Sequence, residues 1–259
     1  SLAQYTQRPM HPIENIFQAI CSHLLPSACI VCGTYQRRTL CLDCLIQLES
    51  DQLSNYECCQ QCGLTLEVSE LTEKCCRKCI KSPPYFDETH CLDRYEGRLQ
   101  SALHLLKYQR RLACAHGLVS AWNQLMSRSL NNLQADYLLP VPLSPEKLCS
   151  RGFNQSWELA RRIDCDKDTH KNPHILRRHH HNQHQAKENR ANRQIAIRDM
   201  FYINPRFQGQ LESATVIVFD DVMTSGATLN EIARVLKDNG VSRVTNWVLL
   251  RTLYPASRM

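Results

Sequence analysis

The chain has 259 residues, a formal charge of +6 at pH 7 and a pI near 8.6. This length accommodates one α/β domain of about 150 to 180 residues plus a smaller module, and the modest positive charge favours anionic partners without specifying nucleic acid. No apolar stretch approaches the ~20 residues that span a bilayer and no basic segment leads into an apolar signal region, so we expect a cytoplasmic protein without a membrane span.

The first 26 residues contain apolar side chains at helical spacing. The pattern consists of Ile13, Ile16, Phe17, Ile20, Leu24 and Leu25, and Pro26 ends it. We predict an amphipathic helix within residues 1–26 that packs on its own protein. Docking to a partner or to a membrane surface is the alternative.

Cysteines dominate the next segment, residues 27–82, where four Cys-x2-Cys pairs occur. The two thiolates of such a pair point at a common centre, and two pairs supply the four ligands of a tetrahedral Zn²⁺. We therefore predict a (double) zinc-ribbon module with one or two structural zinc ions. The eight predicted ligands are Cys29, Cys32, Cys41, Cys44, Cys59, Cys62, Cys76 and Cys79. Cys58 and Cys75 are interpreted as spare thiols.

The spacing of these cysteines leaves their pairing open. A single interleaved site and a cross-braced arrangement are both compatible with it, and disulfides are the alternative to metal. A segment of about 50 residues has too small a core to fold unaided, so bound metal would supply its folding free energy. A catalytic zinc usually has His or carboxylate ligands, which these spacings do not offer.

Residues 81–84, Lys-Ser-Pro-Pro, form a stiff hinge at which we place the domain boundary, with an α/β domain over residues 85–259. After the hinge the pattern predicts helices over 98–107 and 112–130 and an apolar strand at 137–142. The loop that follows carries groups suited to a pyrophosphate, because Arg binds phosphate oxygens bidentately and Gly lets the backbone approach closely. The candidate anion-binding residues are Lys107, Ser144, Arg151 and Gly152.

The segment 177–193 is polar, unperiodic and rich in histidine, and it precedes a short predicted strand at 201–203. We predict a solvated loop, because adjacent side chains in an extended loop diverge. A metal site built from His179, His180, His181 and His184 is the alternative.

The most informative segment is residues 216–228, Val-Ile-Val-Phe-Asp-Asp-Val-Met-Thr-Ser-Gly-Ala-Thr. Its apolar start predicts a strand buried on both faces, and Asp220 and Asp221 sit at the carboxyl end, where open α/β sheets bind ligands. The next residues offer hydroxyls and backbone N–H groups at the start of a helix, with Gly226 where an anion must come close. Simple helix capping is the alternative, and a Walker A loop is excluded because no Lys lies between Asp221 and Leu229.

The order Asp-Asp-x-x-Thr-Ser-Gly-Ala-Thr at 220–228 resembles the phosphoribosyl-pyrophosphate (PRPP) loop of type I phosphoribosyltransferases. This resemblance implies that Asp220 and Asp221 bind the ribose hydroxyls, directly or through Mg²⁺, and that the polar 177–193 segment forms a hood over the substrate. The residues implied to hold the 5′-phosphate are Thr224, Ser225, Gly226, Ala227 and Thr228.

Three further motifs narrow the resemblance: Leu-Lys-Tyr at 106–108, Pro-Val-Pro-Leu at 140–143 and Arg-Gly-Phe-Asn-Gln at 151–155. Together with the paired cysteines they resemble the ComF family of bacterial competence proteins. The implied fold class is α/β, a parallel-sheet type I phosphoribosyltransferase-like domain with a small N-terminal zinc-ribbon module. The implied setting is the cytoplasm during natural transformation, with competence helicase and recombination-mediator proteins as partners.

Two functions fit these patterns. In the first, a competence protein handles incoming single-stranded DNA and retains a site for PRPP or ribose 5-phosphate, with Tyr108, Phe153 and Trp157 stacking on bases. The alternative is an active phosphoribosyltransferase of nucleotide metabolism, whose acceptor and catalytic residues the sequence does not reveal. Fold alone does not choose between them.

Overall fold

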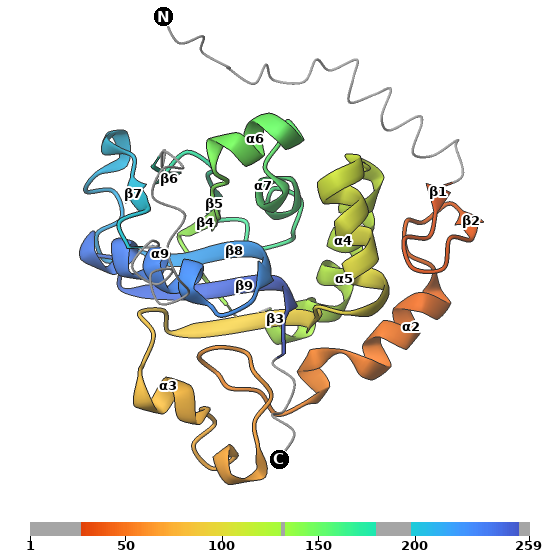
Figure 1. Ribbon diagram of the computed structural model, residues 1–259, viewed down its shortest axis with the longest axis horizontal. Helices are drawn as coiled ribbons and strands as arrows, with labels where there is room; N and C mark the ends of the chain where they lie inside the picture. Colours follow the sequence, from red (N-terminus) through yellow and green to blue (C-terminus); the bar gives the residue numbers. More distant parts are fainter. Residues whose placement is uncertain (1–26, 131–132, 180–197, 254–259) are drawn as a thin grey trace, which may run out of the picture.

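The computed structural model describes residues 27–130, 133–179 and 198–253. Its centre is a five-stranded sheet of order β3-β9-β8-β4-β5 in which all neighbouring strands are parallel (Figure 1). The strands are β3 (Glu88–Arg94), β9 (Arg243–Arg251), β8 (Thr215–Met223), β4 (Tyr137–Pro140) and β5 (His170–Lys171). The predicted α/β class with a parallel sheet is confirmed. The helix predicted within residues 1–26 and the histidines from His180 to His184 lie outside the described residues.

The central strand β8 is covered on both faces. Val216 and Val218 are fully buried in the core on one face, whereas Ile217 and Phe219 are fully buried in the core on the other. This double burial explains the uninterrupted apolar run. The strand is longer than predicted: it continues through both aspartates to Met223, because β9 supplies pairing partners along its whole length.

Helices cover the two faces of the sheet in different combinations. On the face of Phe219 the core is formed with α4 (Gly97–Gln109), α5 (Leu112–Leu130) and α7 (Gln155–Ala160). On the face of Val218 it is formed with α9 (Ala227–Asp238) and the hairpin of β6 (Leu176–Arg178) and β7 (Phe201–Ile203). The helices predicted for 98–107 and 112–130 and the strand at 201–203 are thus confirmed. Within the described residues, no helix has the length and apolar character needed to cross a membrane.

The segment after β4 corrects one prediction. The expected loop that carries Ser144, Arg151 and Gly152 is a short helix, α6 (Pro145–Arg151). Ser144 caps its start by accepting a hydrogen bond from the backbone of Lys147, and Gly152 ends it in the left-handed conformation with φ of 82°. A Ser N-cap followed by Pro is a strong helix-start signal, so this helix was visible in the sequence.

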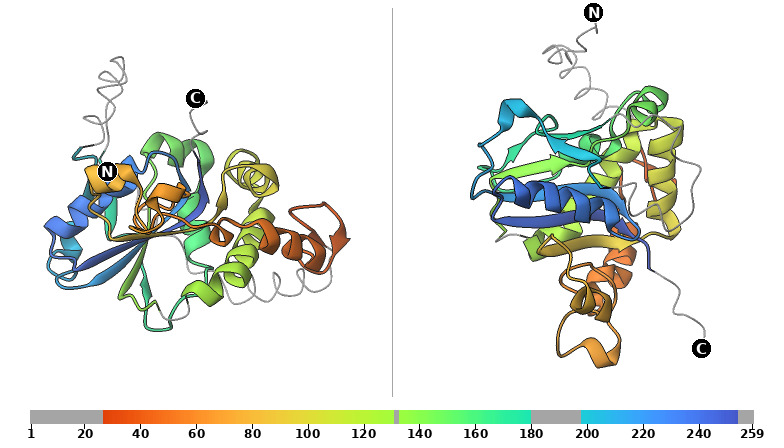
Figure 2. Two further views of the ribbon diagram at one scale, coloured as in Figure 1. Left: turned by 90° about the horizontal axis from the view of Figure 1, so that it is seen from below. Right: turned by 60° about the vertical axis from the view of Figure 1, so that its left-hand side comes forward.

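Two cysteine-bearing segments precede β3. The first contains β1 (Ser27–Ala28), β2 (Tyr35–Gln36) and α2 (Leu42–Asp51), and it lies beside α4 and α5 (Figure 1). The second contains the 3₁₀ turns η1 (Leu53–Asn55) and η2 (Val68–Glu70) and the helix α3 (Arg77–Lys81), and it projects from the β3 edge of the sheet (Figure 2). The boundary that we propose at residues 82–85 falls between α3 and β3.

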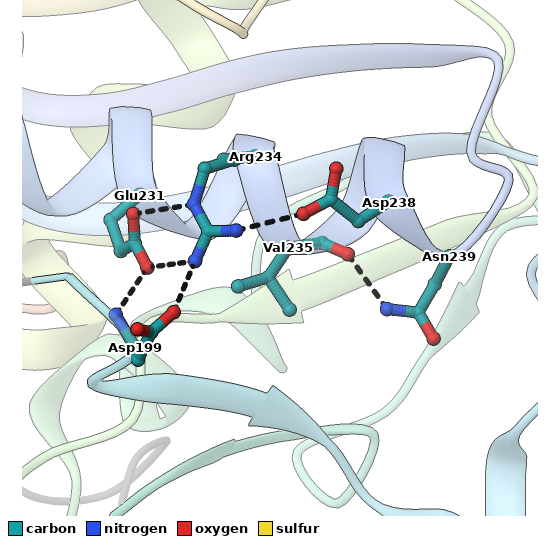
Figure 3. Close-up of polar contacts among 6 residues, drawn as sticks. All are labelled: Asp199, Glu231, Arg234, Val235, Asp238 and Asn239. Atoms are coloured by element: carbon teal, nitrogen blue, oxygen red, sulfur yellow. Dashed lines mark hydrogen bonds and ion pairs between the residues drawn. The ribbon is translucent and has the colours of Figure 1, made fainter.

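The chain re-enters the described region at residue 198 and is fixed at once to α9. The backbone N–H of Asp199 donates to Glu231 Oε1 at 2.7 Å, and Arg234 forms ion pairs with Asp199, Glu231 and Asp238 (Figure 3). The side chains of Glu231 and Arg234 are largely buried, so these ion pairs are stronger than ion pairs on an exposed surface. The chain between the segment predicted to form a hood, 177–193, and β7 is therefore anchored to α9 at Asp199. A further 3₁₀ turn, η4 (Pro205–Phe207), follows this strand.

Candidate functional site

The turn from β8 into α9 leaves backbone N–H groups available at a helix N-terminus. Gly226 is the N-cap residue with φ of 81°, a left-handed conformation that favours glycine over residues with a side chain. The side chains of Thr224 and Ser225 are exposed, and Ser225 Oγ accepts from the N–H of Ala227 at 3.3 Å. The first N–H groups of a helix lack partners within the helix, which favours an anion at this point. The predicted phosphate residues, Thr224 to Thr228, occupy this turn and the first turn of α9.

The two carboxylates of β8 are held in different ways. Asp221 is 4% exposed, its Oδ2 pairs with the ammonium of Lys107, and its Oδ1 accepts from Gln155 Nε2 at 3.4 Å. Asp220 is half-buried, and its Oδ1 accepts from Ser156 Oγ at 3.4 Å and from the backbone N–H of Asp221 at 2.9 Å. Asp220 is therefore the more accessible carboxylate of the pair.

The environment of Asp220 disfavours its charged form. Burial raises the pKa of this carboxyl well above its usual range, and the neighbouring Asp221 raises it further. Lys107 acts in the opposite direction but more weakly. Lys107 thus compensates one negative charge of the pair, and the raised pKa keeps a proton on Asp220 to higher pH.

Three motifs that are distant in the sequence meet beside these carboxylates. The guanidinium of Arg151 lies over the ring of Tyr108, 5.4 Å from its centroid, and donates to Gln155 Oε1 at 2.8 Å. Gln155 in turn donates to Asp221, which pairs with Lys107 on α4. Of the predicted anion-binding residues, Lys107 and Arg151 are thus brought to the carboxylates, whereas the hydroxyl of Ser144 serves as a helix cap.

The sequence interpretation missed the roles of Asn154, Gln155 and Ser156. Asn154 caps α7 through its Oδ1 and donates to the carbonyl of Val141 at 3.0 Å, which fixes the start of α7 against the end of β4. Gln155 and Ser156 then reach the two carboxylates. Of the motif Arg-Gly-Phe-Asn-Gln, only Arg151 and Gly152 were predicted to belong to the anion site. An Asn N-cap before a helix was the signal that could have oriented its neighbours.

The aromatic and basic residues predicted to contact DNA are distributed unevenly. Tyr108 is 63% exposed, whereas Phe153 and Trp157 are partly buried against the core. Arg161 and Arg162 both form ion pairs with Glu158, at 2.8 and 2.6 Å. Tyr108 on α4 is therefore the most exposed of the three aromatic residues, and the two arginines that follow α7 are engaged with Glu158.

The cysteines form two groups in sequence order, Cys29, Cys32, Cys41 and Cys44 in the first tetrad and Cys59, Cys62, Cys76 and Cys79 in the second tetrad. Within each tetrad the Sγ atoms lie within 4.8 Å of one another. Tetrahedral zinc with Zn–S bonds of about 2.3 Å requires sulfurs about 3.8 Å apart. The Sγ atoms of Cys32 and Cys41 are separated by 3.8 Å, and those of Cys62 and Cys76 by 3.6 Å, so both tetrads could hold a metal ion such as zinc.

This grouping answers the question of pairing that the spacing left open. Successive Cys-x2-Cys pairs come together, and Cys58 and Cys75 lie outside both tetrads. All cysteines in the described residues are free, so no disulfide competes with the metal sites there. Hydrogen bonding with Thr34 lowers the pKa of the Cys32 thiol to about 6, which favours the thiolate that a metal requires.

Comparison with known proteins gives relatives that cover most of the chain. The DNA utilization protein YhgH of Escherichia coli O157:H7 is 33% identical over 205 residues, which are 75% of this chain and 84% of that protein. Competence protein F of Haemophilus influenzae is 24% identical over 92% of this chain and 99% of that protein. Competence protein ComFC of Bacillus subtilis is 25% identical over 86% of this chain and 95% of that protein.

The similar solved structures include phosphoribosyltransferases. A hypoxanthine phosphoribosyltransferase from Staphylococcus aureus covers 52% of this chain and 62% of its own, with 16% identity and a TM-score of 0.33. A purine phosphoribosyltransferase from Pyrococcus horikoshii Ot3 covers 55% and 94%, with 13% identity and a TM-score of 0.32. These values are too low to assign a ligand.

No protein-family model matches the chain. The sequence relatives alone are sufficient to assign the chain to a family, because the YhgH proteins exceed 30% identity over most of their length. The chain therefore belongs to the ComF family, which includes the DNA utilization protein YhgH and competence protein F.

Proposed function

We propose that this protein acts in the cytoplasm in natural transformation, where it handles incoming single-stranded DNA and binds PRPP or ribose 5-phosphate at the β8–α9 turn. The names of its relatives, a DNA utilization protein and competence proteins, support the first part. The observation that carries the second part is the meeting of Asp220, Asp221, Lys107 and Arg151 at the strand end that leads into the N-terminus of α9.

Each group of this site has a distinct task in the proposed complex. The N-terminal N–H groups of α9 and the hydroxyls of Thr224 and Ser225 bind the 5′-phosphate. Asp220, as the accessible carboxylate, binds the ribose hydroxyls. Arg151, which lies over the ring of Tyr108, is the cation for a pyrophosphate, and Lys107 adds positive charge beside it while it stays paired with Asp221.

The carboxylates also fit a magnesium ion that accompanies the ligand. Mg²⁺ in proteins is usually bound by one or two carboxylates together with substrate phosphates. Asp221 is already neutralised by Lys107, which leaves Asp220 as the protein ligand. When bound, the ion would offset the negative charge of a pyrophosphate, while the residues of the chain orient the sugar.

The proposed DNA contact uses the exposed surface beside this site. Tyr108 is exposed, its ring lies 4.4 Å from that of His104 and under the guanidinium of Arg151, and Arg110 adds a second positive charge beside α6. Bases stack on such a platform while the guanidinium groups pair with phosphates. Helicase and recombination-mediator proteins are the partners we propose for handing the strand on.

Calorimetry tests the sugar-phosphate site. Ribose 5-phosphate and PRPP, each with Mg²⁺, should bind the wild type, and Asp220→Asn should weaken binding at least tenfold. Asp168→Asn, which changes an exposed carboxylate on another loop, is the matched control and should bind normally. Equal affinities for all three proteins would reject the site. Release of pyrophosphate on addition of candidate acceptors would instead favour an active transferase.

A further inference from the structure

Arg251, the last residue of β9, is a buried charge that the site described above does not use. Its side chain is 1% exposed. Within the described parts of the chain no carboxylate forms an ion pair with it, and its hydrogen bonds go to backbone carbonyls. A buried charge is costly unless its surroundings compensate it, so this placement requires a physical reason.

The hydrogen bonds of Arg251 join two segments that are far apart in the sequence. Its Nε donates to the carbonyl of Cys62, a residue of the second tetrad, at 2.9 Å. Its Nη1 donates to the carbonyl of Met223 at 2.9 Å and also contacts the carbonyl of Thr224. Met223 and Thr224 lead directly into Gly226. One rigid guanidinium therefore connects a cysteine knuckle to the backbone of the phosphate turn.

A second contact runs in parallel. Lys78, on α3, donates through Nζ to the carbonyl of Ser225 at 3.4 Å. This helix begins immediately after Cys76 and contains Cys79, so its position depends on the second tetrad. Arg251 and Lys78 thus connect the second tetrad to three consecutive carbonyls of the turn. Arg251 contacts those of Met223 and Thr224, and Lys78 contacts that of Ser225.

We propose that Arg251 is a positioning residue that couples metal occupancy of the second tetrad to the geometry of the phosphate turn. This inference rests on the proposed sugar-phosphate function and extends it by a regulatory input. Four thiolates around a divalent ion carry a net charge of −2, which compensates the guanidinium. A filled second tetrad fixes the carbonyl of Cys62, Arg251 then fixes those of Met223 and Thr224, and the N–H groups beyond them point at the ligand.

Loss of the metal has a defined consequence in this scheme. The four sulfurs are no longer held together by an ion and the knuckle loosens, so the carbonyl of Cys62 is no longer a fixed acceptor for Arg251. The turn is then free to shift, and its backbone N–H groups no longer point together at the phosphate, so the affinity for the ligand falls. The first tetrad provides an internal control, because the loop that carries it contacts α4 and α5: Arg98 donates to the carbonyl of Val31, and Ile30 packs on Gly117.

Arg251→Lys in the full-length, zinc-loaded protein tests the coupling, because it keeps the charge and removes the fork. We expect the variant to retain its zinc, to show faster hydrogen exchange at the amides of residues 224–228, and to bind ribose 5-phosphate at least tenfold more weakly. Arg243→Lys is the matched control on the same strand, since Arg243 is exposed and pairs with Glu88. It should leave exchange and affinity unchanged.

Metal release supplies a readout that a merely structural role would not change. Because coupling is reciprocal, saturating ribose 5-phosphate should slow chelator-induced zinc release in the wild type and not in Arg251→Lys. Wild-type exchange at 224–228 and wild-type affinity in Arg251→Lys would overturn the inference. If the wild type fails to bind ribose 5-phosphate, the proposed function is wrong, and the exchange rates still decide whether Arg251 couples the second tetrad to the turn.

Discussion

Cys32 of the first tetrad is open to solvent, whereas all four cysteines of the second tetrad are buried. The two tetrads also belong to different cores: Cys29 and Cys44 pack with the α4 and α5 face of the sheet, and the second tetrad packs with the α9 face. The same Cys-x2-Cys motif therefore produces two kinds of site. The two sites differ in how they contact the rest of the molecule. Arg251 connects the second tetrad to the phosphate turn, whereas the loop of the first tetrad contacts α4 and α5.

The largest expected difference between the tetrads is in stability. Cys62→Ser should lower the free energy of unfolding of the sheet by about 3 to 5 kcal/mol, because structural metal supplies folding free energy and this tetrad is continuous with the main core. Cys32→Ser should cost the sheet only about 1 kcal/mol. Urea unfolding followed by the fluorescence of the buried Trp122 and Trp247 measures both. Equal losses would show that burial does not distinguish the tetrads.

The next largest effect concerns Lys107, which lies on the same helix as Arg98, a contact of the first tetrad. Lys107→Met should destabilise the protein by about 3 kcal/mol, because it leaves Asp221 buried without its ion-pair partner. If the first tetrad is independent of the site, this loss should add to that of Cys32→Ser within about 0.5 kcal/mol. A larger coupling in the double variant would mean that α4 transmits strain from the first tetrad to the carboxylates.

Much of this arrangement could be predicted from the sequence, because it depends on local patterns. The spacing of the cysteines gave all eight members of the tetrads, and helical periodicity gave α4 and α5. The turn at 224–228 was recognisable because its hydroxyls and glycine are contiguous. The domain boundary at residues 82–85 and the ligand roles of the site residues stay predictions.

The features that were missed depend on contacts between distant residues. Arg251 ends an apolar strand, and its acceptor in Cys62 is 189 positions away, so no local pattern indicates that the two meet. Gln155 reaches Asp221 across 66 positions for the same reason. The helix α6 is different, since the Ser144 N-cap followed by Pro145 is a local signal for the start of a helix.

A pH dependence of ligand binding is the third expected effect. The pKa of Asp220 is raised by burial and by Asp221, so the folded protein keeps a proton there that the unfolded chain has lost. Binding of ribose 5-phosphate with Mg²⁺ needs the carboxylate, and its affinity should rise by up to about tenfold per pH unit as the pH passes through the raised pKa. Calorimetry across pH should show this rise in the wild type and in Cys32→Ser, and not in Asp220→Asn.

The free energy of unfolding should change with pH in the opposite direction to the ligand affinity. Between the ordinary carboxyl pKa and the raised pKa of Asp220, the folded state binds a proton that the unfolded state has lost. Raising the pH through this window therefore destabilises the wild type relative to Asp220→Asn. Above the window the variant should be the more stable protein, and the difference should vanish once the pH falls to the ordinary carboxyl range. A difference that does not change with pH would show that Asp220 is not the titrating group.

The smallest expected effect tests how the first tetrad is attached. A Cβ at Gly117 on α5 would lie 2.5 Å from Ile30 Cγ2, so Gly117→Ala forces the loop of the first tetrad away from the helix. Overpacking costs about 1 to 3 kcal/mol, and the gain in helix propensity returns about 1 kcal/mol. We expect a net loss near 1 kcal/mol and faster zinc release from the first tetrad. Ile30→Ala in the same chain removes the clashing atoms and should restore slow release, whereas exchange at 224–228 should be unchanged in both variants. Faster exchange there would connect the first tetrad to the phosphate turn and contradict the division between the two sites.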